Sequence, residues 1–396
     1  MDEARREALI TGIGIVSCLG EGPQAHWDAL ASGHPQPDVT TYAPFIVHPI
    51  VPLDFDKQIP KKGDQRQMEL WQRIGTYAAG LALDSAGAKG NAELLARMDM
   101  IVAAGGGERD LAVDSAVLSG IGKAAEPEAF INERLMNDLR PTLFLAQLSN
   151  LLAGNISIVH GVTGSSRTFM GEEAAGVDAV RIAQSRIAAG QSDIVLVGGA
   201  HNGERKDLLM LYEFGNCNLK DRFAPVWQRG PKGGFALASM GAFLVLESRA
   251  HAQARGVAAL ARLSAVASDR ADRKSRGIAE VLTSLWSGLG QLRQGEYAVI
   301  SGACGTEPAT SAEKTFLSSH ADAAVRATGT YLGHAMEPQF IMNIALAAIA
   351  VARANLFPPG DNSGVERPMQ GKLTQVVVTG VGHWRGEGLA LVEAAG

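Results

Sequence analysis

The residues most able to do chemistry follow a glycine- and serine-rich turn in the middle of the chain. The segment 161–166 supplies the small side chains of a tight turn, and 171–189 has apolar residues at helical spacing. Glu172 and Glu173 fall in the first turn of this predicted helix, where acidic side chains suit the helix dipole. A side chain at such a position, inside a packed core, can serve as a nucleophile with a lowered pKa. Here the turn offers Met170 and the two glutamates, but no cysteine or lysine.

The elements that must position this turn alternate between strands and helices. The run 194–199 is short and apolar, which is typical of a strand buried on both faces. Further on, 297–305 and 375–382 are again apolar strands that run into glycines. We therefore expect an α/β fold of two similar halves, 1–248 and 249–396, with mainly parallel strands and helices on the faces.

The composition of the chain argues against several classes of function. The chain has 396 residues and a net charge of −5, which argues against nucleic-acid binding. Its three cysteines, Cys18, Cys217 and Cys304, are too few and too scattered for a disulfide framework or a zinc site. We expect a reducing cytosol, no signal peptide, no metal and no cofactor.

The most apolar predicted helix is the segment 340–357. It contains Asn343 and Arg353, and it falls short of the roughly 20 residues that a membrane span needs. We therefore expect a buried core helix and no membrane span.

Six motifs occur in order along nearly the whole chain. They are ITGIGIVSCLG, GQSDIVLVGGA, FLVLESRAHAQARG, GACGTEPATSAEK, GTYLGH and VTGVG. In these motifs the chain resembles the β-ketoacyl-acyl-carrier-protein synthases, the condensing enzymes of the thiolase-like fold. The resemblance implies five layers, αβαβα, and a dimer whose acyl site lies next to the interface. It also implies acyl carrier protein as a partner.

The family's chemistry needs a cysteine, two histidines and a lysine. The cysteine accepts an acyl chain as a thioester, and the histidines promote decarboxylation of a malonyl thioester and stabilise the enolate. Matched position by position, Glu173 stands where the cysteine belongs and Cys304 where the first histidine belongs. Gly329 stands at the lysine position, and only His334, the second histidine, is retained.

Three further residues are candidates for contact with a substrate. Met170 fits either a core filler or the wall of an acyl tunnel. Thr306 follows the replaced histidine, and Val381 falls near the family's gating phenylalanine. The stretch 383–385 resembles a short insertion after that position.

This set of residues argues against ordinary condensation. A carboxylate is a weak nucleophile, so Glu173 excludes a stable acyl-thioester, although it could act as a base. A thiol is a weak hydrogen-bond donor, so Cys304 replaces a histidine poorly. The interpretations without a functional role are a helix-start acid at Glu173, an inert buried Cys304 and a hydrogen-bonded core His334. The functional interpretations are a glutamate that mimics an acylated cysteine and fixes the neighbouring loops, and a thiol activated by His334.

Three functions follow from these alternatives. The leading one is a non-condensing, chain-length-factor-like subunit of polyketide or fatty-acid synthesis that pairs with an active synthase. The second is an acyltransferase or thioesterase that uses Cys304 and His334. The third is a module that binds acyl carrier protein or acyl chains. Assembly is expected as a heterodimer with a synthase, or as a homodimer. An acidic carrier protein could bind one of two basic clusters, either Lys61, Lys62 and Arg66 or Arg205 and Lys206.

Overall fold

A computed structural model describes residues 6–140, 143 and 147–396. Within these ranges the framework is one sheet of eleven strands. The strands are β1 (Ala8–Ser17), β2 (Gly20–Glu21), β4 (Asp99–Ala104), β5 (Ser166–Phe169), β6 (Ile194–His201), β8 (Met240–Ser248), β9 (Ala261–Asp269), β10 (Tyr297–Ser301), β11 (Ala324–Ala327), β12 (Gln375–Val381) and β13 (Glu387–Glu393). A small second sheet pairs β3 (Val47–His48) with β7 (Leu237–Ala238).

The strand order repeats. The N-terminal half runs β1-β8-β6-β4-β5 and the C-terminal half runs β9-β13-β12-β10-β11. Each half therefore has its first, fifth, fourth, second and third strands in that spatial order, with β2 as an extra strand beside β1. The halves join where 8–10 of β1 pairs with 261–263 of β9. This repeated topology confirms the predicted α/β fold of two similar halves. The strand pairing is mixed, because β4 and β10 are parallel to both of their neighbours, whereas the other neighbours in this sheet pair antiparallel. The residue boundary at 248 stays a prediction.

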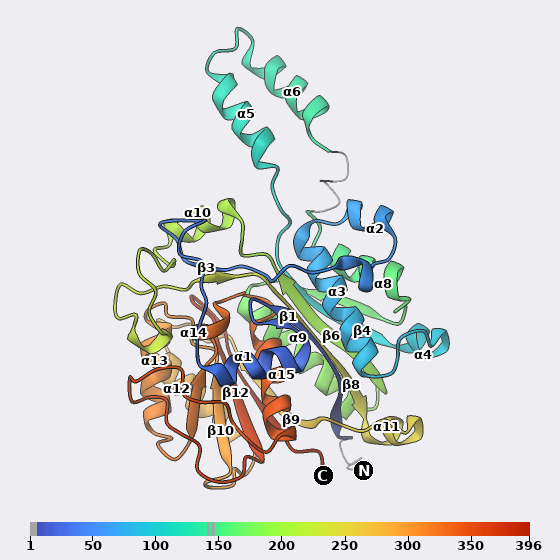
Figure 1. Ribbon diagram of the computed structural model, residues 1–396, viewed down its shortest axis with the longest axis vertical. Coiled ribbons are helices and arrows are strands. Elements are labelled where there is room, and N and C mark those ends of the chain that lie inside the picture. The colour runs from blue at the N-terminus through green and yellow to red at the C-terminus, as the bar shows by residue number, and fades with distance from the viewer. Residues whose placement is uncertain (1–5, 141–142, 144–146) are drawn as a thin grey trace.

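Each half of the sheet forms one layer, and helices form three further layers around and between the halves (Figure 1). They are α3 (Leu70–Ser85) and α8 (Leu151–His160) outside the N-terminal half, α9 (Glu173–Ala188) and α15 (Gln339–Ala352) between the halves, and α12 (Ile278–Ser287) and α13 (Ala309–Ser318) outside the C-terminal half. The residues of α15 are buried from Gln339 to Val351, so the most apolar segment is a core helix. Among the described residues, no helix is both long and apolar enough to cross a membrane.

The remaining helices connect these layers. They are α1 (Gly22–Ser32), α2 (Lys62–Gln67), α4 (Ala92–Arg97), α10 (Lys206–Phe214), α11 (Arg249–Arg255), α14 (Gly329–Leu332) and the 3₁₀ turns at Phe55–Lys57 and Val226–Gln228. The sequence pattern predicts one helix over 65–86, but the chain breaks it at Met68, which is extended. Glu69 then starts α3 with a capping box that it forms with Gln72.

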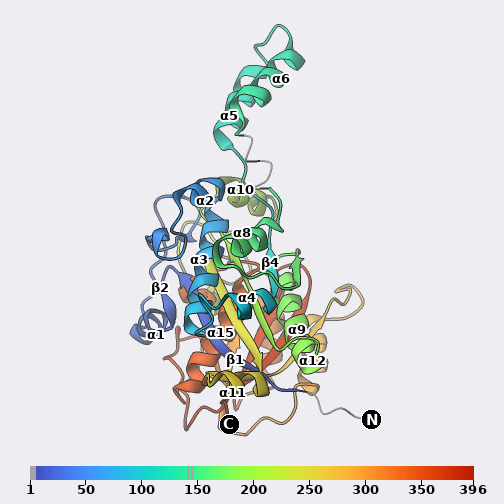
Figure 2. The same ribbon diagram turned by 90° about the vertical axis from the view of Figure 1, so that its right-hand side faces the viewer.

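Two helices stand away from the body of the molecule (Figure 1 and Figure 2). These are α5 (Leu111–Ile121) and α6 (Pro127–Asp138). Val113 is the only buried residue described in the pair, and Leu118 and Met136 are exposed. The pair thus lacks a hydrophobic core shared with the two halves.

Gly14 of β1 allows that strand to pack directly on α3. A methyl group at this position would come within 2.0 Å of the Ala78 carbonyl oxygen and 2.4 Å of the Ala82 nitrogen. We therefore expect Gly14→Ala to lower the free energy of unfolding by on the order of 2–3 kcal/mol, measured by urea denaturation. Gly63→Ala is the control, because Gly63 lies in α2 with nothing within 4 Å of an added methyl group. Equal effects of the two changes would contradict this packing.

Candidate functional site

The site is built on a strained turn at the start of α9. Glu172, the residue before the helix, has φ 55° and ψ −135°, a conformation that is uncommon for any residue but glycine. Its carboxylate accepts hydrogen bonds from the Tyr212 hydroxyl at 3.1 Å and from the Trp384 indole Nε1 at 2.6 Å. These contacts hold the turn in place. The helix therefore begins at Glu173, whose side chain points into the core between the halves.

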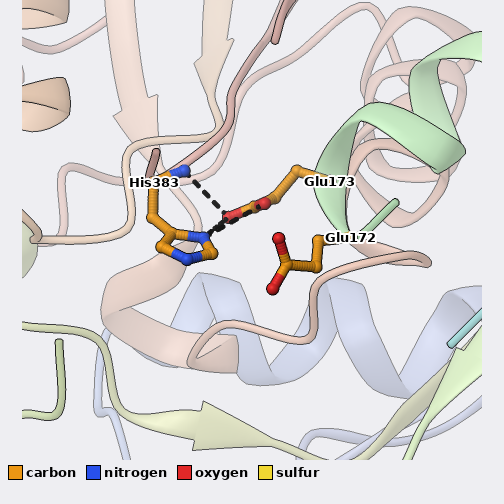
Figure 3. Close-up of side chains that lie close together, drawn as sticks. All are labelled: Glu172, Glu173 and His383. Atoms are coloured by element: carbon orange, nitrogen blue, oxygen red, sulfur yellow. Dashed lines mark hydrogen bonds and ion pairs between the residues drawn. The ribbon is translucent and has the colours of Figure 1, made fainter. Parts of the chain in front are cut away.

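The Glu173 carboxylate is the centre of a buried hydrogen-bond cluster. The residue is 5% exposed, and its Oε1 accepts three hydrogen bonds. His334 Nε2 donates at 2.8 Å, His383 Nδ1 at 2.9 Å and the His383 backbone nitrogen at 3.1 Å. Figure 3 shows His383 facing Glu173, with Glu172 beside them. Two imidazoles thus share one carboxylate oxygen.

Both histidines are fixed through their backbones. The His334 nitrogen donates to the Ala236 carbonyl at 2.8 Å, and its carbonyl accepts from the Ala238 nitrogen at 2.9 Å. His383 sits in a turn after β12 that is closed by a hydrogen bond from the Gly382 nitrogen to the Gly386 carbonyl at 2.8 Å. Three segments far apart in the sequence therefore meet at Glu173.

Aromatic rings line the cluster. The Phe235 ring centroid lies 5.3 Å from that of His334 and 5.6 Å from that of His383. Tyr212 packs edge-on against Phe235 at 5.1 Å. Such walls lower the local dielectric, which strengthens the interaction between carboxylate and imidazolium.

The protonation states follow from this environment. Burial alone would raise the pKa of Glu173, but the hydrogen bonds and charges of His334 and His383 outweigh it and hold that pKa below its ordinary value. Burial alone would lower the pKa of His383, but the Glu173 carboxylate outweighs it and raises that pKa. The start of a helix also favours a negative side chain. Glu173 and His383 therefore form an ion pair.

This arrangement gives little support to condensation chemistry. The residue that the resemblance assigns to the nucleophile position, Glu173, is a carboxylate, and His334 Nε2 donates to it. The resemblance assigns this histidine to the thioester carbonyl, where one donor to a developing oxyanion contributes about 10²–10³ in rate. A donor already held by Glu173 cannot serve a carbonyl without breaking the cluster.

Cys304 lies in the loop after β10 and is buried. Its Sγ is 3.0 Å from the Thr306 hydroxyl oxygen, and no hydrogen bond joins it to His334 among the described residues. Burial, with the nearby Glu173 carboxylate, raises the pKa of the thiol to about 12. A protonated thiol without a basic partner is a poor nucleophile, so this geometry gives no support to a Cys304–His334 pair.

Gly329, which the resemblance assigns to the lysine position, has no room for a longer side chain. A methyl group there would lie 2.9 Å from the Ala303 carbonyl oxygen. A buried guanidinium lies nearby instead, because Arg229 donates to the Cys304 carbonyl at 2.7 Å and, more weakly, to the Gly329 carbonyl at 3.4 Å. Burial lowers the pKa of Arg229 to about 10. Arg229 thus connects two of the positions at which the resemblance implies a replacement.

The three substrate candidates lie in different surroundings. Met170 is 62% exposed, so the interpretation of Met170 as core filler is wrong. The sequence pattern does not reveal the edge strand β5 directly before it, and β5 carries Met170 outward. Thr306 contacts Cys304, whereas Val381 packs in the outer core of the C-terminal half. Their contact with a substrate stays a prediction.

Sequence reasoning missed His383, Trp384 and Arg229. The first two lie in a stretch that resembles an insertion, and its signal is a histidine directly after a glycine that ends the VTGVG motif. Glu172, Glu173 and His383 offer three possible metal-ligand atoms within 4.8 Å of one another. Their carboxylate oxygens already accept hydrogen bonds from Tyr212, His383 and Trp384, so a cation would compete with these donors.

The Glu173–His383 pair predicts a pH window of stabilisation. Folding lowers the pKa of Glu173 from 4.5, so its contribution is complete above pH 4.5 and is lost as pH falls towards its folded pKa. Folding raises the pKa of His383 from 6.5, so its contribution is complete below pH 6.5 and is lost as pH rises through its folded pKa. Glu173→Gln should therefore lower the free energy of unfolding by roughly 1.5–3 kcal/mol between pH 4.5 and pH 6.5, and by less at lower or higher pH.

Urea unfolding from pH 4 to 8 measures this cost, and NMR titration of His383 should show a lower pKa in the variant. Exposed Glu93, changed to Gln, is the control for loss of one negative charge. A pH-independent cost would mean that the pair is not charged.

Cysteine reactivity tests the burial of the thiols. At pH 8 we expect iodoacetamide to label Cys217, which is partly exposed, well before Cys304. Cys18 should also react slowly, because burial raises its pKa to about 12. Peptide mass spectrometry of the native and unfolded protein gives the rates. Fast labelling of Cys304 in the native protein would reopen a catalytic role for it.

The sequence of this chain is similar to those of known β-ketoacyl synthases. The model of the β-ketoacyl synthase N-terminal domain matches residues 5–252, which include Glu173. A 3-oxoacyl-[acyl-carrier-protein] synthase 2 from Vibrio harveyi is 26% identical over 273 residues, 66% of this chain and 62% of the relative. The enzyme of that name from Rhizobium meliloti is 24% identical over 276 residues, 63% of this chain and 61% of the relative. The alignments thus span about 60% of these relatives' length.

Solved structures extend the likeness to the whole fold. The ishigamide ketosynthase/chain length factor has a TM-score of 0.79 at 18% identity and covers 99% of this chain and 100% of its own. The ketosynthase complex AntDE:AntF has a TM-score of 0.77 at 17% identity, with the same coverage. The family match, which spans more than half of the chain, confirms the resemblance: this protein belongs to the β-ketoacyl synthase family.

Proposed function

We propose that this protein is a non-condensing subunit of fatty-acid or polyketide biosynthesis that acts beside an active β-ketoacyl synthase. One observation carries the proposal. At the position where the family places its nucleophile, the Glu173 carboxylate is buried and is held by His334 and His383. The ketosynthase fold is retained around this carboxylate, and the side chain at that position is not a thiol that could accept an acyl chain.

In this proposal Glu173 takes the place of an acylated cysteine. Its side chain is longer than that of cysteine and ends in oxygens that accept hydrogen bonds, as a thioester carbonyl does. The histidine loops are thereby kept in one arrangement without a bound substrate. The similarity in fold to a ketosynthase/chain length factor supports this proposal.

The proposed partners are an active synthase and an acyl carrier protein. In the AntDE:AntF structure, a type II polyketide synthase acyl-carrier protein is in complex with its ketosynthase. On this chain, Lys61 and Arg66 are exposed on or beside α2 and could meet an acidic carrier. The cytosol is the proposed location.

Intact-protein mass spectrometry tests the proposal. The protein is incubated with acyl- and malonyl-carrier protein, alone and after co-expression with a synthase that has the full set of cysteine, histidines and lysine. We expect no covalent adduct on this chain, co-purification with the synthase and acylation of the synthase.

The variant Glu173→Cys is the matched control, because it restores a thiol at the nucleophile position. An acyl adduct on this variant would show that a carrier-bound chain reaches the site. An adduct on the native chain, or condensation by the protein alone, would overturn the proposal.

A further inference from the structure

The turn that carries His383 is the connection of a hairpin. It joins β12 to β13, whose residues Val381 and Glu387 pair with each other on either side of it. The bond that closes the turn uses the Gly382 amide, and the carbonyl groups of Gly382 and His383 accept no hydrogen bond from the hairpin among the described residues. The direction in which the turn holds His383 therefore depends on groups outside the hairpin.

Arg273, in the loop after β9, supplies donors to this turn. Its Nη2 donates to the Gly382 carbonyl at 2.7 Å and its Nη1, more weakly, to the His383 carbonyl at 3.4 Å. Nε and Nη2 also donate to the Glu387 carboxylate at 2.9 and 2.7 Å. The Glu387 carboxylate is buried, and the Arg273 side chain is only 18% exposed. One planar guanidinium thus bridges the start of the turn and the strand that follows it.

The loop that carries Arg273 is also tied to α9. Arg270 donates to the Asp178 carboxylate at 2.6 Å, and the Ser268 hydroxyl donates to it at 3.3 Å. Asp178 lies later in the helix that Glu173 begins. Because Arg270 is 56% exposed, its contact stabilises the protein less than that of Arg273. One loop therefore contacts both elements that form the Glu173–His383 pair.

The charge of Arg273 does not favour that ion pair. Burial and the Arg273 charge lower the pKa of His383, whereas the carboxylates of Glu173 and Glu172 raise it and outweigh them. Arg273 and His383 are both cations when the pair is formed, and Glu387 offsets part of the repulsion. What Arg273 contributes to the pair is therefore the position of the backbone, through the two carbonyl groups that it binds.

We propose that Arg273 is a positioning residue, which holds the turn so that the ring and the amide of His383 both reach Glu173 Oε1 (Figure 3). The inference rests on the proposed function, in which this pair keeps the histidine loops in one arrangement without a bound substrate. Among the described residues Arg273 has no hydrogen bond to Glu172 or Glu173, so it acts on the site through His383.

Amide hydrogen exchange measured by NMR tests this role at a single bond. The His383 amide donates to Glu173 Oε1 at 3.1 Å, so its exchange rate reports on the position of the turn. We expect Arg273→Met to speed this exchange at least about tenfold, while the Val378 amide in β12 keeps its native rate. Unchanged exchange at His383, or equal acceleration at Val378, would overturn the proposal.

Arg276→Met is the matched control. Arg276 lies in the same loop and pairs with Asp269 and Glu280, without a hydrogen bond to the turn among the described residues. It should leave the exchange of His383 unchanged, and an equal acceleration would overturn the assignment to Arg273. Arg273→Lys keeps the charge but loses the planar fork, so it should restore only part of the protection. Full protection by lysine would mean that charge, not position, is the cause.

Thermal melting shows whether each variant is folded. If Arg273→Met does not fold, the exchange of Arg273→Lys decides the proposal, since that variant should still lose part of the protection at His383.

A second background separates positioning from ordinary packing. In a protein that carries Glu173→Gln, the bond to His383 is already weakened, so Arg273→Met should speed exchange by a smaller factor than in the native chain. An equal factor in both backgrounds would overturn the proposal. The mass experiment is independent of this result: an acyl adduct on the native chain would overturn the proposed function, whereas the exchange rates decide the role of Arg273 in either case.

Discussion

The interaction on which this molecule depends is the hydrogen bonding of one buried carboxylate oxygen by two imidazoles. An ionised carboxylate at the centre of a protein is costly unless donors surround it. Glu173 comes from the N-terminal half, whereas His334 and His383 come from loops of the C-terminal half. The pairing therefore links the two halves across their central helical layer, and each loop conformation depends on the others.

The same pairing is the basis for proposing that this family member keeps the fold of a condensing enzyme without its activity. The start of α9, the His334 loop and the turn after β12 converge, and the groups that converge there hydrogen-bond to one another. Arg229 adds to this closure, since it donates to the carbonyl groups of Cys304 and Gly329. On the proposed function, this hydrogen bonding gives the site a structural role.

Much of the fold could be predicted from the sequence because its signals are local. Apolar runs that end in glycines mark the repeated strands, and the Glu172–Glu173 pair marks the start of α9. The four-residue strand β5 carries no such signal, so the exposure of Met170 could not be foreseen. His383 was missed for another reason: its role arises only when the turn after β12 folds back over α9.

The contacts of Arg229 make the replaced positions interdependent. A lysine introduced at 329 would meet the Ala303 carbonyl and would bring a second cation towards the guanidinium. A histidine at 304 would have to fit beside Thr306 in a buried loop that Arg229 tethers through its backbone. If the protein is non-condensing, as proposed, conversion into a condensing enzyme would be strongly epistatic, because each introduced residue would be accommodated only after its neighbours had changed.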